Sequence, residues 1–180
     1  SWSCAHGVGR WSRNCGCSTG GEQGWSQAWR EPLRAAFRLI KGHADEAFTQ
    51  LGRGLLHDPW GARDRYVEVI VGAAGLEDWL ARETTGSLDK ADLDRTASLL
   101  ELQRNAMSMF TSCAWFFSDV GGTETVQNLR YAARTIGLLE ELDRPMAGDL
   151  LMSSLAQAKS NNHSSGSAAD ILQSLSSSGY

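Results

Sequence analysis

Four side chains that commonly bind metals lie within the first 17 positions of the chain. They form two short patterns, Cys4-x-His6 and Cys15-x-Cys17. Zinc prefers four thiolate or imidazole donors arranged as a tetrahedron, and this set supplies four. The one-residue gaps are tighter than the usual ligand spacing. Three interpretations therefore stay open: a zinc site, a disulfide in an oxidising compartment, or thiols packed in a loop beneath tryptophan rings.

A second candidate site in the same segment combines a histidine, an arginine and tryptophans. Sugar rings have apolar C–H faces that stack on aromatic side chains, while His and Arg can contact sugar hydroxyls or a carboxylate. The candidate substrate-binding residues are Trp2, His6, Arg10 and Trp11. His6 is also a candidate general acid or base, because imidazole titrates near neutral pH. The alternative is a structural histidine bonded to a loop carbonyl.

Two carboxylates flank the Gly121-Gly122 pair and are further catalytic candidates. They are Asp119 and Glu124. Glu124 falls in the first turn of a predicted helix, where the helix dipole favours a negative charge, so a capping role is the alternative. Trp25 and Trp29 are predicted to anchor the segment by burial, and the Trp115–Phe117 run is predicted to be core.

Length and charge exclude several classes of protein. The 180 residues carry 17 Lys+Arg against 21 Asp+Glu, a net charge of −4. This mild acidity argues against nucleic-acid binding, which needs a concentrated positive field. No run of about 18 apolar residues is present, so no membrane span is expected. An (α/β) barrel typically needs about 250 residues and does not fit in this length.

The chain divides into three predicted regions. Residues 1–30 are rich in Gly, Trp and Cys and are predicted to be a loop segment packed on the bundle. Residues 31–158 show helical periodicity and predict an all-α helical bundle. Residues 159–180 are rich in serine and are predicted to be a flexible tail. The expected helices are 31–42, 44–56, 60–71, 76–81, 91–117, 124–142 and 146–158, with a possible turn at 170–175.

The cysteine distribution favours a reducing, cytoplasmic setting. Three of the four cysteines lie in the first 17 residues, whereas a secreted disulfide scaffold spreads them along a shorter chain. Cys113 lies alone in an apolar stretch and is predicted to be a buried thiol that acts as a small hydrophobic residue.

A series of motifs runs through the chain in a fixed order. They are Ser1–Gly7, Arg10-Trp11, Cys15–Cys17, Gly24-Trp25, Gln27–Arg30, Asp58–Trp60, Leu99–Arg104, Met109–Phe117, Glu124–Gln127 and Leu129–Arg134. Together they resemble a helical domain of unknown function that follows a glycoside hydrolase family 57-type barrel in bacterial proteins of the α-amylase or α-mannosidase type. The resemblance covers roughly residues 1–160, although Ala114 stands where glycine is expected, residues 119–123 form a looser turn, and the serine-rich end differs.

The resemblance implies a role in carbohydrate metabolism, with the catalytic carboxylates on a barrel that this chain lacks. The chain is then expected to be a piece of a longer protein or a separate partner of the barrel, inactive alone, that completes a rim binding an oligo- or polysaccharide. The alternative is a stand-alone, non-catalytic helical module, stapled by zinc, that binds a partner protein.

Overall fold

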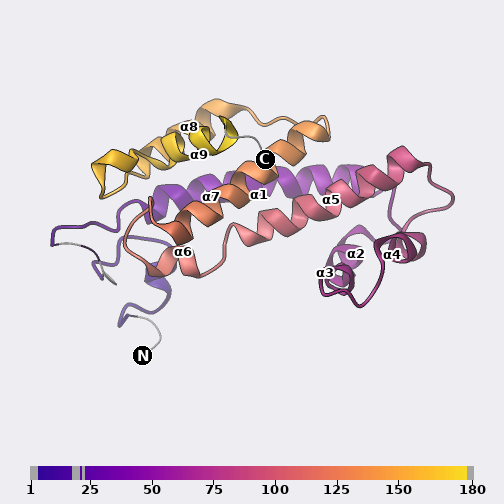
Figure 1. Cartoon of the computed structure of the whole chain (residues 1–180), viewed down its shortest axis with the longest axis horizontal. Helices are drawn as coiled ribbons and strands as arrows, with labels where there is room; N and C mark the ends of the chain where they lie inside the picture. The colour runs from indigo at the N-terminus through magenta and orange to yellow at the C-terminus, as the bar shows by residue number, and fades with distance from the viewer. Residues whose placement is uncertain (1–3, 18–20, 22, 178–180) are drawn as a thin grey trace.

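The chain folds as an all-α bundle in its computed structural model, as the sequence predicts (Figure 1). The structure describes residues 4–17, 21 and 23–177. Among them, no helix combines the length and the apolar character that crossing a membrane requires. The elements are the 3-10 helix η1 (Gly7–Trp11), α1 (Arg30–Gly52), α2 (Pro59–Arg65), α3 (Val67–Ile70), α4 (Leu76–Glu83), α5 (Lys90–Ser108), α6 (Cys113–Phe116), α7 (Thr123–Glu141), α8 (Gly148–Gln157), the 3-10 helix η2 (His163–Ser165) and α9 (Ala168–Ser177).

The helices α1, α5 and α7 form the centre of the bundle, and α8 and α9 pack on α1 and α7 (Figure 1). Aromatic rings fill the end of this core nearest the N-terminal segment. The rings of Trp29 and Trp115 stack with centroids 6.1 Å apart, and Phe37 meets Trp115 edge-on. Trp29 is buried, which confirms its predicted anchoring role. Trp115 is core as predicted, but Phe117 is 38% exposed, so the core prediction was wrong for that residue.

The first long helix is continuous where the sequence predicted two helices separated at Gly42. A glycine inside a helix costs only about 1 kcal/mol relative to alanine, and burial of an apolar stripe outweighs that cost. The stripe runs past the glycine without a break. Its buried members are Leu33, Ala36, Phe37, Ile40, Ala44, Ala47 and Phe48.

The predicted helix 91–117 is interrupted between α5 and α6, so its continuity was also wrong. The side chain of Asn128, on α7, takes the place of helical hydrogen bonds there. Its amide donates to the carbonyls of Met109 (2.8 Å) and Thr111 (3.2 Å). The Thr111 hydroxyl donates back to Asn128 at 2.7 Å. A partner on another helix thus creates the break, and no glycine or proline marks it.

Helix α2 begins where the Asp58-Pro59 pair predicted. Asp58 accepts a hydrogen bond from the backbone N–H of Gly61 at 3.1 Å, and proline occupies the first turn. The predicted helix 60–71 is instead two short helices, α2 and α3, that meet at Tyr66. The Tyr66 ring packs edge-on against Trp79 and its hydroxyl donates to Glu101, which fixes this corner.

The serine-rich C-terminal region differs from the flexible tail that was predicted, because residues 168–177 form α9. Ala168, Ala169 and Leu172 are buried along one face of this helix. The hydroxyls of Ser176 and Ser177 donate to backbone carbonyls four residues earlier, which satisfies polar groups that would otherwise favour irregular backbone.

Replacing Leu172 with alanine should lower the free energy of unfolding by about 2–5 kcal/mol, the usual cost of truncating a buried leucine. Its neighbour Gln173 is exposed. Gln173→Ala should therefore change the free energy of unfolding by less than about 0.5 kcal/mol. Urea denaturation followed by circular dichroism measures both. Equal small effects would mean that α9 does not pack on the bundle in solution.

Candidate metal centre

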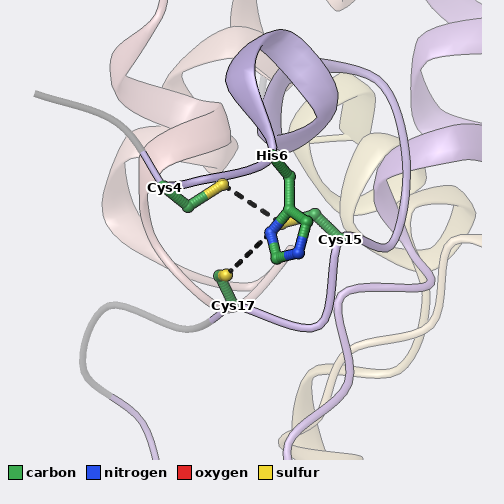
Figure 2. Close-up of side chains that lie close together, drawn as sticks. All are labelled: Cys4, His6, Cys15 and Cys17. Carbon is green, nitrogen blue, oxygen red and sulfur yellow. Dashed lines mark hydrogen bonds between the residues drawn. The ribbon is translucent and has the colours of Figure 1, made fainter.

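The N-terminal segment folds back so that its two ligand pairs face each other (Figure 2). After Cys4 the chain turns into η1, with Gly7 at a φ of 59° and its N–H bonded to the Cys4 carbonyl at 3.2 Å. The segment that returns after η1 carries Cys15 and Cys17 on either side of Gly16, which has a φ of 73°. Positive φ favours glycine, so the two glycines permit the reversal that brings the pairs together.

The four ligand atoms lie close enough for one metal ion to contact all of them. The sulfurs of Cys4, Cys15 and Cys17 and a ring nitrogen of His6 are all within 4.8 Å of one another. The Cys4 and Cys15 sulfurs are 3.9 Å apart, and the Cys17 sulfur is 3.2 Å from Nδ1 of His6. Zinc–ligand bonds of about 2.3 Å (S) and 2.0 Å (N) set tetrahedral edges of about 3.8 Å and 3.5 Å. The two short distances are close to these edges, and every other separation in the set is at most 4.8 Å.

The thiols of the cluster differ in their tendency to ionise. The backbone N–H of His6 hydrogen-bonds to Cys4 and lowers the pKa of Cys4 to about 6. Desolvation, followed by the hydrogen bond and negative charge of Cys4, raises the pKa of Cys17. The Cys4 thiolate therefore forms readily, and its negative charge makes ionisation of Cys17 less favourable. A bound divalent cation removes that repulsion, because its charge favours every thiolate at once.

Two arginines attach η1 to the bundle beside this cluster. Arg10 is buried: its guanidinium donates to the Phe116 carbonyl at 3.0 Å and lies 5.0 Å from the centre of the Phe116 ring. Arg34, on α1, donates to the Trp11 carbonyl at 2.6 Å and lies against the Phe110 and Trp115 rings. The segment that carries the ligands is therefore held to α1 and α6.

A third arginine contacts the cluster directly. Arg30, in the first turn of α1, is fully buried. One of its amino groups is 3.6 Å from the Cys15 sulfur and the other donates to the Phe117 carbonyl at 3.0 Å. Burial lowers the pKa of Arg30, whereas the negative charge of Cys15 raises it. Arg30 thus connects the ligand set to the helical core.

Three of the four predicted substrate-binding residues, His6, Arg10 and Trp11, belong to the described part of the chain, and they differ in exposure. Trp2 lies outside the described residues, and His6 belongs to the candidate metal-binding cluster. Arg10 is buried against Phe116, and Trp11 is half-buried with its carbonyl bonded to Arg34. Of this set, the structure places His6 at the surface and directs the Arg10 guanidinium into the protein. A sugar-binding role for the set stays a prediction.

Asp119 is buried and its carboxylate is fully engaged as a hydrogen-bond acceptor. It accepts from the Ser160 hydroxyl (2.8 Å), the Asn161 backbone N–H (2.7 Å) and the Gly121 backbone N–H (3.0 Å). These bonds join the loop before α7 to the segment after α8. Glu124 lies half-buried in the first turn of α7, where the capping interpretation places it. The geometry gives Asp119 a structural role.

Two residues with important contacts, Asn161 and Arg30, were not among the predicted site residues. Asn161 bonds Ser26 through both its amide oxygen (2.8 Å) and its amide nitrogen (2.9 Å), and donates to Ser118 at 2.8 Å. Arg30 contacts the thiol cluster. These contacts join positions far apart in sequence, so no local spacing indicates them. The position of Cys113 was also predicted incorrectly: it is exposed, because α6 turns its thiol away from the core.

The comparisons with known proteins return one family. The family model of a domain of unknown function, DUF3536, matches residues 25–178. No curated protein and no solved structure matches the chain. The match contains Arg30, Asp119 and Asn161 and begins after the four candidate metal-binding residues.

Proposed function

The chain belongs to the DUF3536 family, and from that premise we propose that it is a non-catalytic helical module whose N-terminal segment is organised by a single zinc ion. Cys4, His6, Cys15 and Cys17 are the ligands. The ion fastens a glycine-rich segment that has only one short helix of its own, η1, among its described residues.

The observation that carries this proposal is the convergence of four donor atoms within 4.8 Å. Structural zinc sites use four protein ligands, whereas catalytic zinc sites use three and leave a position for water. Three cysteines and one histidine complete the tetrahedron. The chemistry that this arrangement supports is therefore stabilisation of the fold rather than activation of a water molecule.

Zinc suits the site better than other metals. Thiolate and imidazole donors in a tetrahedron favour zinc, whereas magnesium, calcium and manganese favour oxygen. An iron–sulfur cluster contains several iron and sulfide ions, which would hold the ligands further apart than one ion does. All four donor atoms lie within 4.8 Å of one another, which supports a mononuclear centre.

Metal analysis of the purified chain tests this proposal. We expect about one zinc per chain after purification under reducing conditions, and a lower melting temperature after treatment with a strong chelator, since metal binding contributes to folding. Adding zinc back should restore the melting temperature. A metal-free protein that binds no added zinc would overturn the proposal, as would a melting temperature that the chelator leaves unchanged.

The motif resemblance supports a more specific role for the module. We propose that it accompanies a family 57-type catalytic barrel, in the same or a separate chain, and helps to bind an oligo- or polysaccharide. The buried, fully bonded carboxylate of Asp119 supports a non-catalytic part, because a glycosidase needs carboxyl groups that reach the scissile bond. A cytoplasmic location agrees with three closely spaced thiols that remain reduced for zinc.

Activity assays and co-purification test that role. The purified chain should not hydrolyse α-glucans or α-mannosides, and it should co-purify with a family 57-type barrel from the same source when the two are expressed together. Turnover by the chain alone would contradict the non-catalytic role. Separate elution of the two proteins, together with failure of the barrel's activity to respond to the added chain, would contradict the partnership.

A further inference from the structure

Arg30 is a fully buried cation with no carboxylate partner in the described part of the chain. None of the ion pairs found there includes it. Its guanidinium stands over the Trp29 ring, 5.4 Å from the ring centre, and its Nε has no hydrogen-bond partner among the described residues. A buried charge is costly unless an opposite charge or strong hydrogen bonds compensate it.

The metal centre supplies the missing negative charge. A divalent ion bound by three thiolates and a neutral imidazole carries a net charge of −1. The sulfur nearest Arg30 is that of Cys15, at 3.6 Å, within the range of an N–H···S hydrogen bond. We propose that Arg30 is the counter-ion of the zinc centre: it donates to the Cys15 thiolate and balances the charge of the occupied site. This inference rests on the proposed zinc site.

The shape of the guanidinium matters as well as its charge. Its two amino groups reach different targets, the Cys15 sulfur and the Phe117 carbonyl, which lies between α6 and α7. The rigid fork therefore fixes the position of the Cys15 sulfur relative to the bundle. A lysine in the same place retains the charge but has a compact ammonium that cannot reproduce the planar fork.

Arg34 provides a matched comparison on the same helix, four residues further on. It also lies against aromatic rings and donates to the N-terminal segment, through the Trp11 carbonyl. No hydrogen bond from Arg34 to a thiol is found among the described residues, in contrast to Arg30. Both substitutions remove a guanidinium that packs on the core, but only the change at Arg30 removes a contact with a ligand.

The test measures zinc affinity of the full chain by competition with a chelator, for the wild type, Arg30→Met, Arg30→Lys and Arg34→Met. Loss of an outer partner of a metal ligand typically weakens binding about 10- to 100-fold. We expect the zinc affinity of Arg30→Met to fall by this factor, and that of Arg30→Lys to fall by less. The affinity of Arg34→Met should change by less than about threefold, because the contact of Arg34 lies outside the ligand set.

The absorption spectrum of the cobalt(II)-loaded protein gives a second measurement, which a change in packing alone would not alter. A hydrogen bond stabilises the sulfur lone pairs, so its loss should shift the thiolate-to-cobalt charge-transfer band to longer wavelength in Arg30→Met but not in Arg34→Met. If Arg30→Met does not fold, Arg30→Gln, which keeps two donors without the charge, takes its place. An affinity within threefold of the wild type and an unshifted band would overturn the inference while the zinc site stands. A wild type that binds neither zinc nor cobalt would overturn both.

Discussion

Replacing Cys17 with serine is expected to abolish stoichiometric zinc binding and to leave the helical content of the bundle nearly unchanged. Serine is a poor zinc ligand, so the ion would lose one corner of its tetrahedron. We expect the affinity to fall by more than about 100-fold, the upper range for loss of a partner outside the ligand set. The core around Trp29 and Trp115 does not contain Cys17, so the helices should persist.

Cys113→Ser is the matched control, because this exposed thiol belongs to α6 and lies outside the proposed metal-binding group. It should retain one zinc per chain. Elemental analysis measures the metal and circular dichroism measures the helical content of both variants. Equal zinc content in Cys17→Ser and Cys113→Ser would show that the N-terminal cluster is not the binding site.

Replacing Asp119 with alanine should lower the free energy of unfolding by about 3 kcal/mol or more, because a buried acceptor with several hydrogen-bond donors is removed. Three donors would lose their acceptor: the Ser160 hydroxyl and the backbone N–H groups of Asn161 and Gly121. Each buried donor left unsatisfied costs about 1–3 kcal/mol. Chemical denaturation measures the loss.

Glu124→Ala is the comparison for this prediction. Glu124 lies half-buried in the first turn of α7, where the helix dipole contributes about 0.3–1 kcal/mol. The two carboxylates looked alike in the sequence, since they flank the same glycine pair. A large loss at Asp119 and a small loss at Glu124 would separate a structural network from a cap. Similar losses would contradict the role assigned to Asp119.

The fold class could be predicted because its signals are local. The Asp58-Pro59 pair marked the start of α2, and the apolar spacing marked α7 and both halves of α1, which was wrongly divided at Gly42. Other errors arose where contacts between residues distant in sequence decide the outcome. The break after α5 depends on Asn128, a residue of another helix, and the helix at 168–177 forms because its apolar face meets α7 and α8. Serine content alone indicated a flexible tail there.

The candidate site also combines features that local sequence indicates with contacts that only the folded chain creates. Its four candidate ligands are close in sequence, so their types and spacing offered a zinc site as one of three interpretations, and the structure brings the four side chains together. The arrangement that supports the site could not be predicted, because Arg30 reaches Cys15 only after α1 packs beside the returning segment. Trp11 and Arg10 lie near His6 in sequence, yet their contacts with Arg34 and Phe116 turn them toward the bundle.

X-ray absorption at the zinc edge tests the central claim most directly, because it reports which atoms surround the ion. For the full chain loaded with one equivalent of zinc, we expect three sulfurs at about 2.3 Å and one nitrogen at about 2.0–2.1 Å. In Cys17→Ser one sulfur should be lost. A first shell made only of oxygen and nitrogen atoms, unchanged between the two proteins, would contradict the claim that these cysteines and His6 hold the metal.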